Sequence, residues 1–134
     1  MSHNLKIGIC GWGNVATGLF EQLNQSVDNQ PYEIVCIGAR RDNPKCDPGG
    51  IKIHRDIFDV INEDIDVVVE LIGGTETARE LISKALNAGK HVITANKAVM
   101  YEHGHELINL ANQKNSYLLF EAAVAAGTPI IKML

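Results

Sequence analysis

The feature of this sequence that most constrains its fold is a glycine-rich turn between an apolar run and a helical pattern. Residues 6–10 (KIGIC) lead into GWGNVA at 11–16, which fits the pattern G-x-G-x-x-G/A. In that pattern Gly11 allows a tight turn, Gly13 removes a side chain that would block a pyrophosphate, and Ala16 lets helix and strand pack closely. Unbonded N–H groups at the helix start then face an anion. The turn predicts dinucleotide binding, with a purely structural strand-to-helix turn as the alternative.

Short apolar runs alternate with helical patterns along the chain, which is typical of crossover units and a parallel sheet. The runs occupy residues 6–10, 34–38, 51–53, 67–72, 91–94 and 117–120. Because successive residues are apolar, the strands should be covered on both faces. We therefore expect an α/β fold of the Rossmann type, a doubly wound, mostly parallel sheet with helices on both faces, in which residues 1–134 form a single NAD(P)-binding domain.

Three helical patterns lie between these runs. The first pattern turns Val15, Leu19, Phe20 and Leu23 inward. The second begins with the capping-box spacing Thr77-x-x-Glu80 and ends at Gly89, and its buried residues are Leu81, Ile82, Ala85 and Leu86. The third carries the apolar residues Leu107, Ile108, Leu110 and Ala111. Residues 41–50, with two prolines and two glycines, should form a loop. The sequence stops inside a helical pattern that begins at Thr128 and Pro129, so we expect a fragment that lacks a following substrate domain.

Composition and charge argue against several classes of function. The net charge is −4 and both signs are interspersed, which disfavours nucleic acid as a partner. No run approaches the roughly 18 apolar residues of a membrane span, and no apolar leader is present. We therefore expect no membrane partner and a cytoplasmic location. Cys10, Cys36 and Cys46 form no C-x-x-C pair and should be free thiols in a reducing compartment.

The tip of the second predicted strand bears on the choice of dinucleotide. A carboxylate there would bond the ribose hydroxyls of NAD, but the sequence after Gly38 is Ala39-Arg40-Arg41. Two guanidiniums suit a 2′-phosphate through charge-assisted, bidentate bonds. We expect NADP as the cofactor; NAD remains possible, because the two arginines could instead be a solvated pair beside Asp42.

Three further strand ends carry small residues where a flat ring could lie. They are residues 70–75 (ELIGGT), which include Gly73 as a cofactor contact, residues 94–98 (TANKA) and residues 121–129 (EAAVAAGTP). Lys97 is the only cation among them. It could bind a substrate carboxylate, polarise a carbonyl or be an ordinary loop lysine, and the spacing does not decide between these.

The segments E-L-I-G-G, G-K-H-V-I-T-A-N-K-A and E-A-A-V-A-A-G-T-P-I-I occur in this order after the glycine turn. In this the chain resembles the nucleotide-binding domain of homoserine dehydrogenase over essentially its whole length. Related oxidoreductases share the first domain but typically have Glu-Lys-Pro where this chain has Asn96-Lys97-Ala98. That difference favours homoserine dehydrogenase.

The resemblance implies roles at matching positions. It places Trp12, Asn14 and Val15 in the turn that holds the cofactor phosphates, Arg40 at the 2′-phosphate, and Thr94 and Lys97 beside the nicotinamide. It also implies a monovalent cation such as sodium, held by Glu121 and the backbone carbonyls of Val124, Ala126 and Thr128. These cation ligands follow from the resemblance and not from their spacing.

The implied reaction is reversible hydride transfer between L-aspartate 4-semialdehyde and L-homoserine, a step of threonine and methionine biosynthesis. Lys97 would be a catalytic residue near the reacting carbon, and a second lysine from a following substrate domain would donate the proton. The full-length enzyme should be a homo-oligomer that acts on a small molecule. The alternatives are a non-catalytic nucleotide-sensing module and another two-domain dehydrogenase with the same first domain.

Other conspicuous side chains are given structural interpretations. His103 and His105 lie two apart in a helical pattern and should point to different sides, which disfavours a shared zinc ion. His54, beside Arg55, is expected to be solvated. Trp12 could either cover the cofactor or pack on the neighbouring loop.

Overall fold

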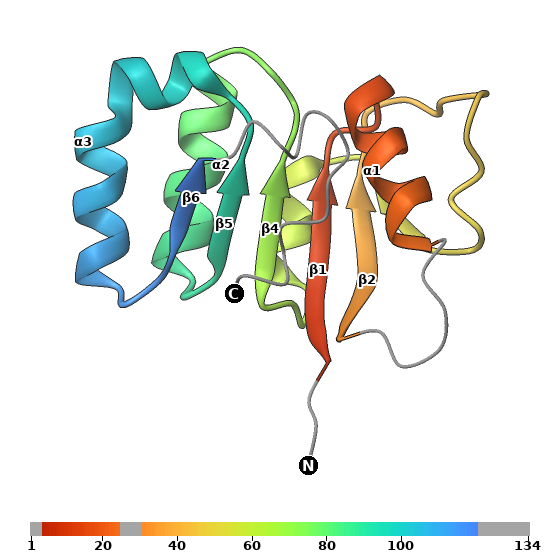
Figure 1. Cartoon of the computed structure of the whole chain (residues 1–134), viewed down its shortest axis with the longest axis horizontal. Helices are drawn as coiled ribbons and strands as arrows, with labels where there is room; N and C mark the ends of the chain where they lie inside the picture. The colour runs from red at the N-terminus through yellow and green to blue at the C-terminus, as the bar shows by residue number, and fades with distance from the viewer. Residues whose placement is uncertain (1–3, 25–30, 121–134) are drawn as a thin grey trace.

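The computed structural model describes residues 4–24 and 31–120, and in this part of the chain six parallel strands form one sheet in the order β3-β2-β1-β4-β5-β6 (Figure 1). The strands are β1 (Leu5–Cys10), β2 (Tyr32–Gly38), β3 (Lys52–His54), β4 (Val67–Glu70), β5 (His91–Thr94) and β6 (Leu118–Phe120); the helices are α1 (Asn14–Asn24), η1 (Ile57–Asn62, a 3-10 helix), α2 (Glu76–Asn87) and α3 (Lys97–Gln113). The chain runs from β1 outward to β3 and then returns to β4 on the other side of β1. This order is that of a Rossmann fold and confirms the predicted fold class.

Helices cover both faces of the sheet, as its apolar strands require. Along β1, Ile7 and Ile9 face the cluster formed with α1, whereas Cys10 faces the cluster formed with η1, α2 and α3. Figure 1 shows α1 in front of the sheet at β2, and α2 behind it at β5. Leu19 and Leu23 of α1 are each 1% exposed. Burial of such a side chain contributes about 1.5–3 kcal/mol, so packing against the sheet holds α1 in place.

The helix η1 was not predicted from the sequence. Asp56 caps it by accepting a hydrogen bond from the N–H of Phe58, and Ile57, Val60 and Ile61 turn toward the sheet. A Cβ atom on Gly38 would lie 2.9 Å from Val60 Cγ2, so η1 packs directly on bare strand backbone. The signal was present, because an aspartate followed by apolar residues at i+1, i+4 and i+5 is typical of a short capped helix.

The strand predictions are confirmed to within a few residues at each end, and residues 41–50 form the predicted loop.

Three predictions about residues in the helices were wrong. Helix α2 begins at Glu76 after Thr75, so Thr77 lies inside the first turn and does not cap it. Val15 is 39% exposed and Ile108 is 46% exposed, so neither belongs to the core. Both lie at the edge of an apolar stripe, where periodicity alone cannot separate inward from outward positions.

The three cysteines are free, as predicted, with Cys10 and Cys36 buried. Burial raises the pKa of the Cys10 thiol strongly and that of Cys36 to about 11, because a thiolate is poorly solvated in the apolar interior. Among the described residues, no helix combines the length and apolarity that crossing a membrane would demand.

Candidate cofactor-binding site

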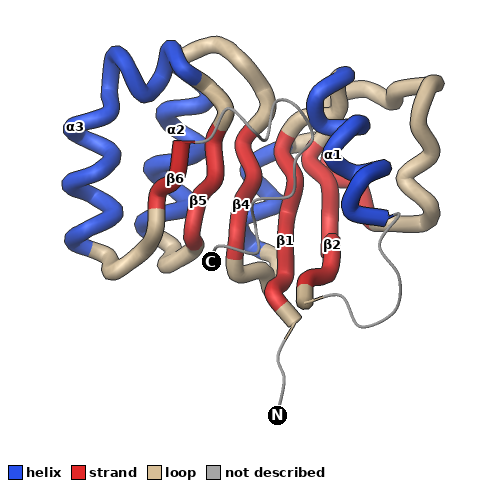
Figure 2. Tube along the Cα trace, viewed as in Figure 1, coloured by secondary structure: helices blue, strands red, loops and turns tan. Residues whose placement is uncertain are grey.

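The candidate site lies where the carboxyl ends of β1, β2 and β4 meet. The N–H of Gly11 donates to the Gly38 carbonyl at 2.8 Å, and the N–H of Leu71 donates to the Cys10 carbonyl at 2.8 Å. The loops that follow β4 and β5 lie along the same edge of the sheet as the turn into α1 (Figure 2). Because the chain reverses its direction across the sheet between β1 and β4, this edge is the switch point at which open α/β sheets bind ligands.

Gly11 has a backbone conformation that only glycine adopts easily. Its φ is +113°, and an added Cβ would lie 2.6 Å from the carbonyl oxygen of Leu71. The close approach of this turn to the loop after β4 therefore depends on the missing side chain.

Replacing Gly11 with alanine should destabilise the fold. The strained φ and the contact with Leu71 together should lower the free energy of unfolding by about 2–4 kcal/mol. Urea denaturation measures the change. Gly18→Ala is the matched control, because Gly18 lies in α1 and an added Cβ would meet no atom within 4 Å. An equal loss of stability in both variants would contradict the conformational role of Gly11.

Gly13, the second glycine of the pattern, borders open space. Gly13 is exposed, and an added Cβ would meet nothing within 4 Å. Its carbonyl accepts the first bond of α1, from the N–H of Thr17 at 2.9 Å. The N–H groups of Asn14 and Val15 lie in the first turn, where helices have no internal acceptor. An anion seated over Gly13 would meet these groups and the positive end of the helix dipole.

A pocket of about 490 Å³ extends from this turn. Gly11, Trp12, Gly13, Gly38, Ala39, Arg40, Arg41, Asp42, Asn43, Pro44, Ile57, Leu71, Ile72, Gly73 and Thr77 line it. The structure thus brings both predicted arginines, exposed at the tip of β2, into the same pocket as the glycine turn. Among the described lining residues Asp42 is the one acid, and the guanidinium of Arg55 is hydrogen-bonded to it.

Trp12 packs against the protein, as one of the two interpretations predicts, and it also lines the larger pocket. Its ring is 7% exposed and lies edge-on to Phe20, with ring centroids 5.2 Å apart. Its carbonyl also accepts a hydrogen bond from the side-chain amide of Asn43 at 3.1 Å. The indole therefore joins the glycine turn to α1, and the Trp12 backbone joins it to the loop after β2. Ala16 lies beside it in the same core cluster and is 1% exposed.

A second pocket, of about 310 Å³, adjoins the first. Val15, Glu70, Leu71, Gly73, Ala95, Asn96 and Lys97 line it. Leu71 and Gly73 line both pockets, so the two are neighbours across the carboxyl ends of the strands, and we refer to them together as the crevice. An elongated ligand with two halves fits this arrangement.

Hydrogen bonds between buried polar groups stabilise the loops that border the second pocket. Glu70 is 0% exposed, and its carboxylate accepts hydrogen bonds from the Thr94 hydroxyl at 2.5 Å and the N–H of Ile72 at 2.9 Å. The same hydroxyl accepts from the N–H of Asn96 at 2.9 Å. Thr94 therefore acts as a link between Glu70 and the loop that leads to Lys97. No role for Glu70 was predicted from the sequence; the signal is a lone acid that ends the apolar run VVVE.

Lys97 begins α3 and lies exposed in the second pocket. Asn96 caps the helix by accepting from the N–H of Val99 at 3.1 Å, and its amide donates to the Gly74 carbonyl. A cation in the first turn opposes the helix dipole. Helix stability therefore does not explain a lysine at this position.

Some predicted residues are not brought to this site or cannot be placed. Glu121, Val124, Ala126 and Thr128, the expected cation ligands, lie outside the described residues. The prediction of a solvated His54 was wrong, because its Nε2 lies 2.6 Å from a carboxylate oxygen of Glu63 and its side chain is 16% exposed. Its neighbour Arg55 is the exposed one of the two.

Comparisons with known proteins agree with this geometry. Residues 11–121 match the family described as "Homoserine dehydrogenase, NAD binding domain". The homoserine dehydrogenase of Pseudomonas aeruginosa is 49% identical over 97% of this chain and 32% of its own length, and that of Synechocystis is 41% identical over 97% and 32%. The crystal structure of a homoserine dehydrogenase from Thiobacillus denitrificans superposes with a TM-score of 0.81 and 35% identity, covering 90% of this chain and 30% of that one.

These matches favour the dehydrogenase over the nucleotide-sensing module and the other two-domain dehydrogenases considered above. The chain spans about a third of the length of the curated relatives it matches. The glycine turn, the crevice and the family match lead to the same assignment: this chain belongs to the homoserine dehydrogenase family and contains that family's NAD-binding domain.

Proposed function

We propose that this domain binds NADP and, joined to a substrate domain, catalyses reversible hydride transfer between L-aspartate 4-semialdehyde and L-homoserine. The observation that supports this best is the crevice of two neighbouring pockets, with the glycine turn and two arginines in one and Lys97 in the other. When bound, the nicotinamide supplies or accepts the hydride. We place the enzyme in the cytoplasm, as a homo-oligomer that serves threonine and methionine biosynthesis.

The residues of the crevice have separate tasks in this proposal. The glycine turn from Gly11 to Ala16 holds the pyrophosphate, with the N–H groups of Asn14 and Val15 as donors, and Gly73 together with Thr94 and the loop after it borders the nicotinamide. The Lys97 ammonium lies where it can bind the substrate carboxylate or stabilise charge on the carbonyl oxygen. Glu70 and Thr94 fix the loop that carries Lys97, and so position the lysine. We also propose the sodium site at Glu121 and the backbone carbonyls of Val124, Ala126 and Thr128.

The charges around the tip of β2 support NADP over NAD. Arg40 and Arg41 both line the larger pocket, where a 2′-phosphate would gain charge-assisted hydrogen bonds. The carboxylate of Asp42 would repel that phosphate, but Arg55 neutralises it. Arg55 also donates to the Ala39 carbonyl at 3.3 Å, which holds the loop against β3. The local charge therefore remains positive.

Replacing Arg40 with glutamine should weaken NADPH binding much more than NADH binding. A hydrogen bond to a charged group is worth about 1.5–3 kcal/mol, so we expect at least about a tenfold rise in the Kd for NADPH. NADH lacks the 2′-phosphate, and its Kd should change by less than about twofold. Arg79→Gln serves as control, because Arg79 pairs with Glu106 between α2 and α3, outside both pockets. Equal effects on both nucleotides would remove Arg40 from cofactor selection.

Thermal unfolding with added nucleotide tests the proposal as a whole. A ligand that binds only the folded state at a hundred times its Kd stabilises by about 2.7 kcal/mol. For a domain of this size the melting temperature should rise by roughly 5–15 °C with NADPH, and less with the same concentration of NADH. No rise with either nucleotide at millimolar concentration would contradict cofactor binding.

A further inference from the structure

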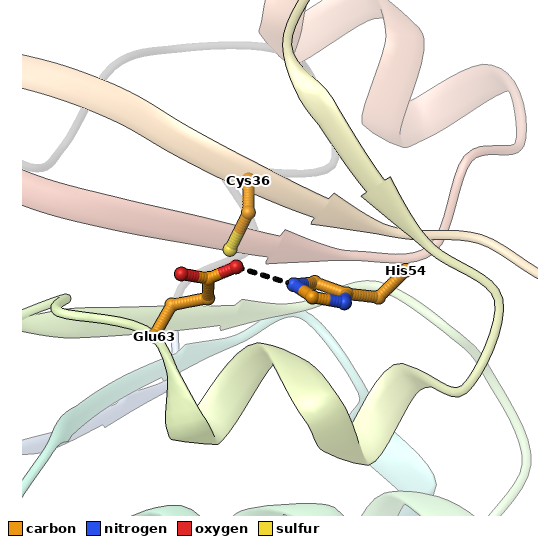
Figure 3. A group of neighbouring side chains, drawn as sticks. All are labelled: Cys36, His54 and Glu63. Carbon is orange, nitrogen blue, oxygen red and sulfur yellow. Dashed lines mark hydrogen bonds and ion pairs between the residues drawn. The ribbon is translucent and has the colours of Figure 1, made fainter.

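Three side chains of different donor chemistry meet under the edge of the sheet. Cys36 lies in β2, His54 ends β3, and Glu63 directly follows η1. Figure 3 shows their thiol, imidazole and carboxylate groups turned toward one another. One ligand atom of each residue lies within 4.8 Å of those of the other two. We propose that Cys36, His54 and Glu63 form a site for a divalent transition-metal ion of the zinc class.

The donor set determines which ions suit the site. A thiolate sulfur, an imidazole nitrogen and a carboxylate oxygen are all ligands of Zn²⁺ and Co²⁺, whereas Mg²⁺ and Ca²⁺ prefer oxygen alone. Three protein ligands leave the fourth tetrahedral position for water. In such a tetrahedron the donor atoms lie about 3.3–3.7 Å apart, as bond lengths of about 2.0–2.3 Å require. The ligand atoms lie within 4.8 Å of one another, so they differ from this by about 1.5 Å or less, which side-chain rotation can supply.

Burial and charge are also compatible with an ion. Cys36 is buried, and the side chains of His54 and Glu63 are 16% and 22% exposed, so an ion would be shielded but reachable from water. A thiolate and a carboxylate together carry two negative charges, which a divalent cation balances. In the structure the Lys52 ammonium lies 3.0 Å from Glu63 and supplies part of that positive charge.

Binding would follow a simple proton balance. The Cys36 thiol loses its proton to solvent as sulfur bonds the ion. The hydrogen bond between His54 Nε2 and Glu63 breaks, and its hydrogen passes to solvent while Nδ1 holds the ring's remaining hydrogen, so that the Nε2 lone pair faces the ion. The Lys52 side chain is 66% exposed and can turn into water when the ion replaces it. No electron transfer is involved, so no further reactant is needed.

A simple ion-paired group of His54, Glu63 and Lys52 is the competing interpretation. It would fasten the end of η1 to β3 and would explain the lowered pKa of the Glu63 carboxyl, which the His54 and Lys52 contacts cause. It gives no role to the Cys36 sulfur. The two interpretations therefore differ in whether a thiolate joins the group when a metal is added.

Cobalt titration of the purified, chelator-stripped protein tests the proposal. We expect saturable binding of one Co²⁺, a sulfur-to-cobalt charge-transfer band in the near ultraviolet, strong visible bands of a tetrahedral ion, and loss of colour when Zn²⁺ is added. Cys36→Ser should abolish the charge-transfer band, while the matched control Cys46→Ser should keep it. Loss of even an outer-shell partner costs about 10- to 100-fold in affinity, so His54→Gln and Glu63→Gln should raise the Kd for Co²⁺ at least about tenfold.

Two results would overturn the proposal. One is the absence of a thiolate–cobalt band in the unsubstituted protein, and the other is a band that persists in Cys36→Ser. Should Cys36→Ser fail to fold, Glu63→Gln decides, because its side chain lies outside the apolar core and an unchanged Kd for Co²⁺ would contradict the site. None of these measurements involves nucleotide, so their outcome is independent of the proposed cofactor binding.

Discussion

Replacing Gly13 with valine should abolish binding of NADPH while leaving the fold intact. An added side chain meets no protein atom within 4 Å, so it projects into the crevice that the pyrophosphate is proposed to fill. Losing two hydrogen bonds to a charged group, at about 1.5–3 kcal/mol each, raises the Kd at least about a hundredfold. Fluorescence titration with NADPH measures this effect, and thermal unfolding without nucleotide measures the stability.

Gly18→Ala is the control for this experiment. Gly18 lies one turn further along α1, is exposed, and would place its Cβ in open space as well. Its Kd for NADPH should equal that of the unsubstituted protein. If Gly13→Val binds NADPH normally, the phosphates do not lie over this turn and the crevice has another occupant.

Replacing Lys97 with alanine should lower the turnover of the full-length enzyme by at least about tenfold, which corresponds to about 1.4 kcal/mol of transition-state stabilisation. The physical reason is the loss of the ammonium from the second pocket, where the substrate is proposed to react. Binding of NADPH should stay within a few-fold of normal, because the pyrophosphate and the 2′-phosphate are held in the other half of the crevice. Steady-state kinetics on L-homoserine, combined with a NADPH titration, separates the two effects.

Lys114→Ala is the matched control, since Lys114 caps the opposite end of the same helix. Its turnover should be normal. A Lys97→Ala enzyme with unchanged turnover would remove this residue from the mechanism, and the lysine at the start of α3 would then need another explanation.

The fold could be predicted from the sequence because the hydrophobic pattern and the turn residues indicate the same fold. The apolar runs are continuous where strands are covered on both faces, and Gly11, with φ at +113°, lies where the pattern required a tight turn. The same agreement predicts that the glycine turn, the two arginines and Lys97 lie at the carboxyl edge of the sheet, where the two pockets are found.

What could not be predicted depends on contacts between distant segments. Helix η1 was not predicted. Its capping aspartate gives a local signal, but its three inward residues span too few turns for a strong periodic signal. The bond between Thr94 and Glu70 joins residues 24 positions apart, so no local pattern shows it. The proximity of Cys36, His54 and Glu63 likewise depends on the pairing of β3 with β2 and on the position of η1 against these strands. No local sequence pattern shows either contact.

A crystal structure with NADPH bound tests the central claim most directly. The account predicts that pyrophosphate oxygens lie within hydrogen-bonding distance of the N–H groups between Gly11 and Ala16, with the 2′-phosphate at Arg40 and the nicotinamide beside Gly73 and Lys97. Nucleotide bound at another surface, with this crevice free of it, would contradict the account.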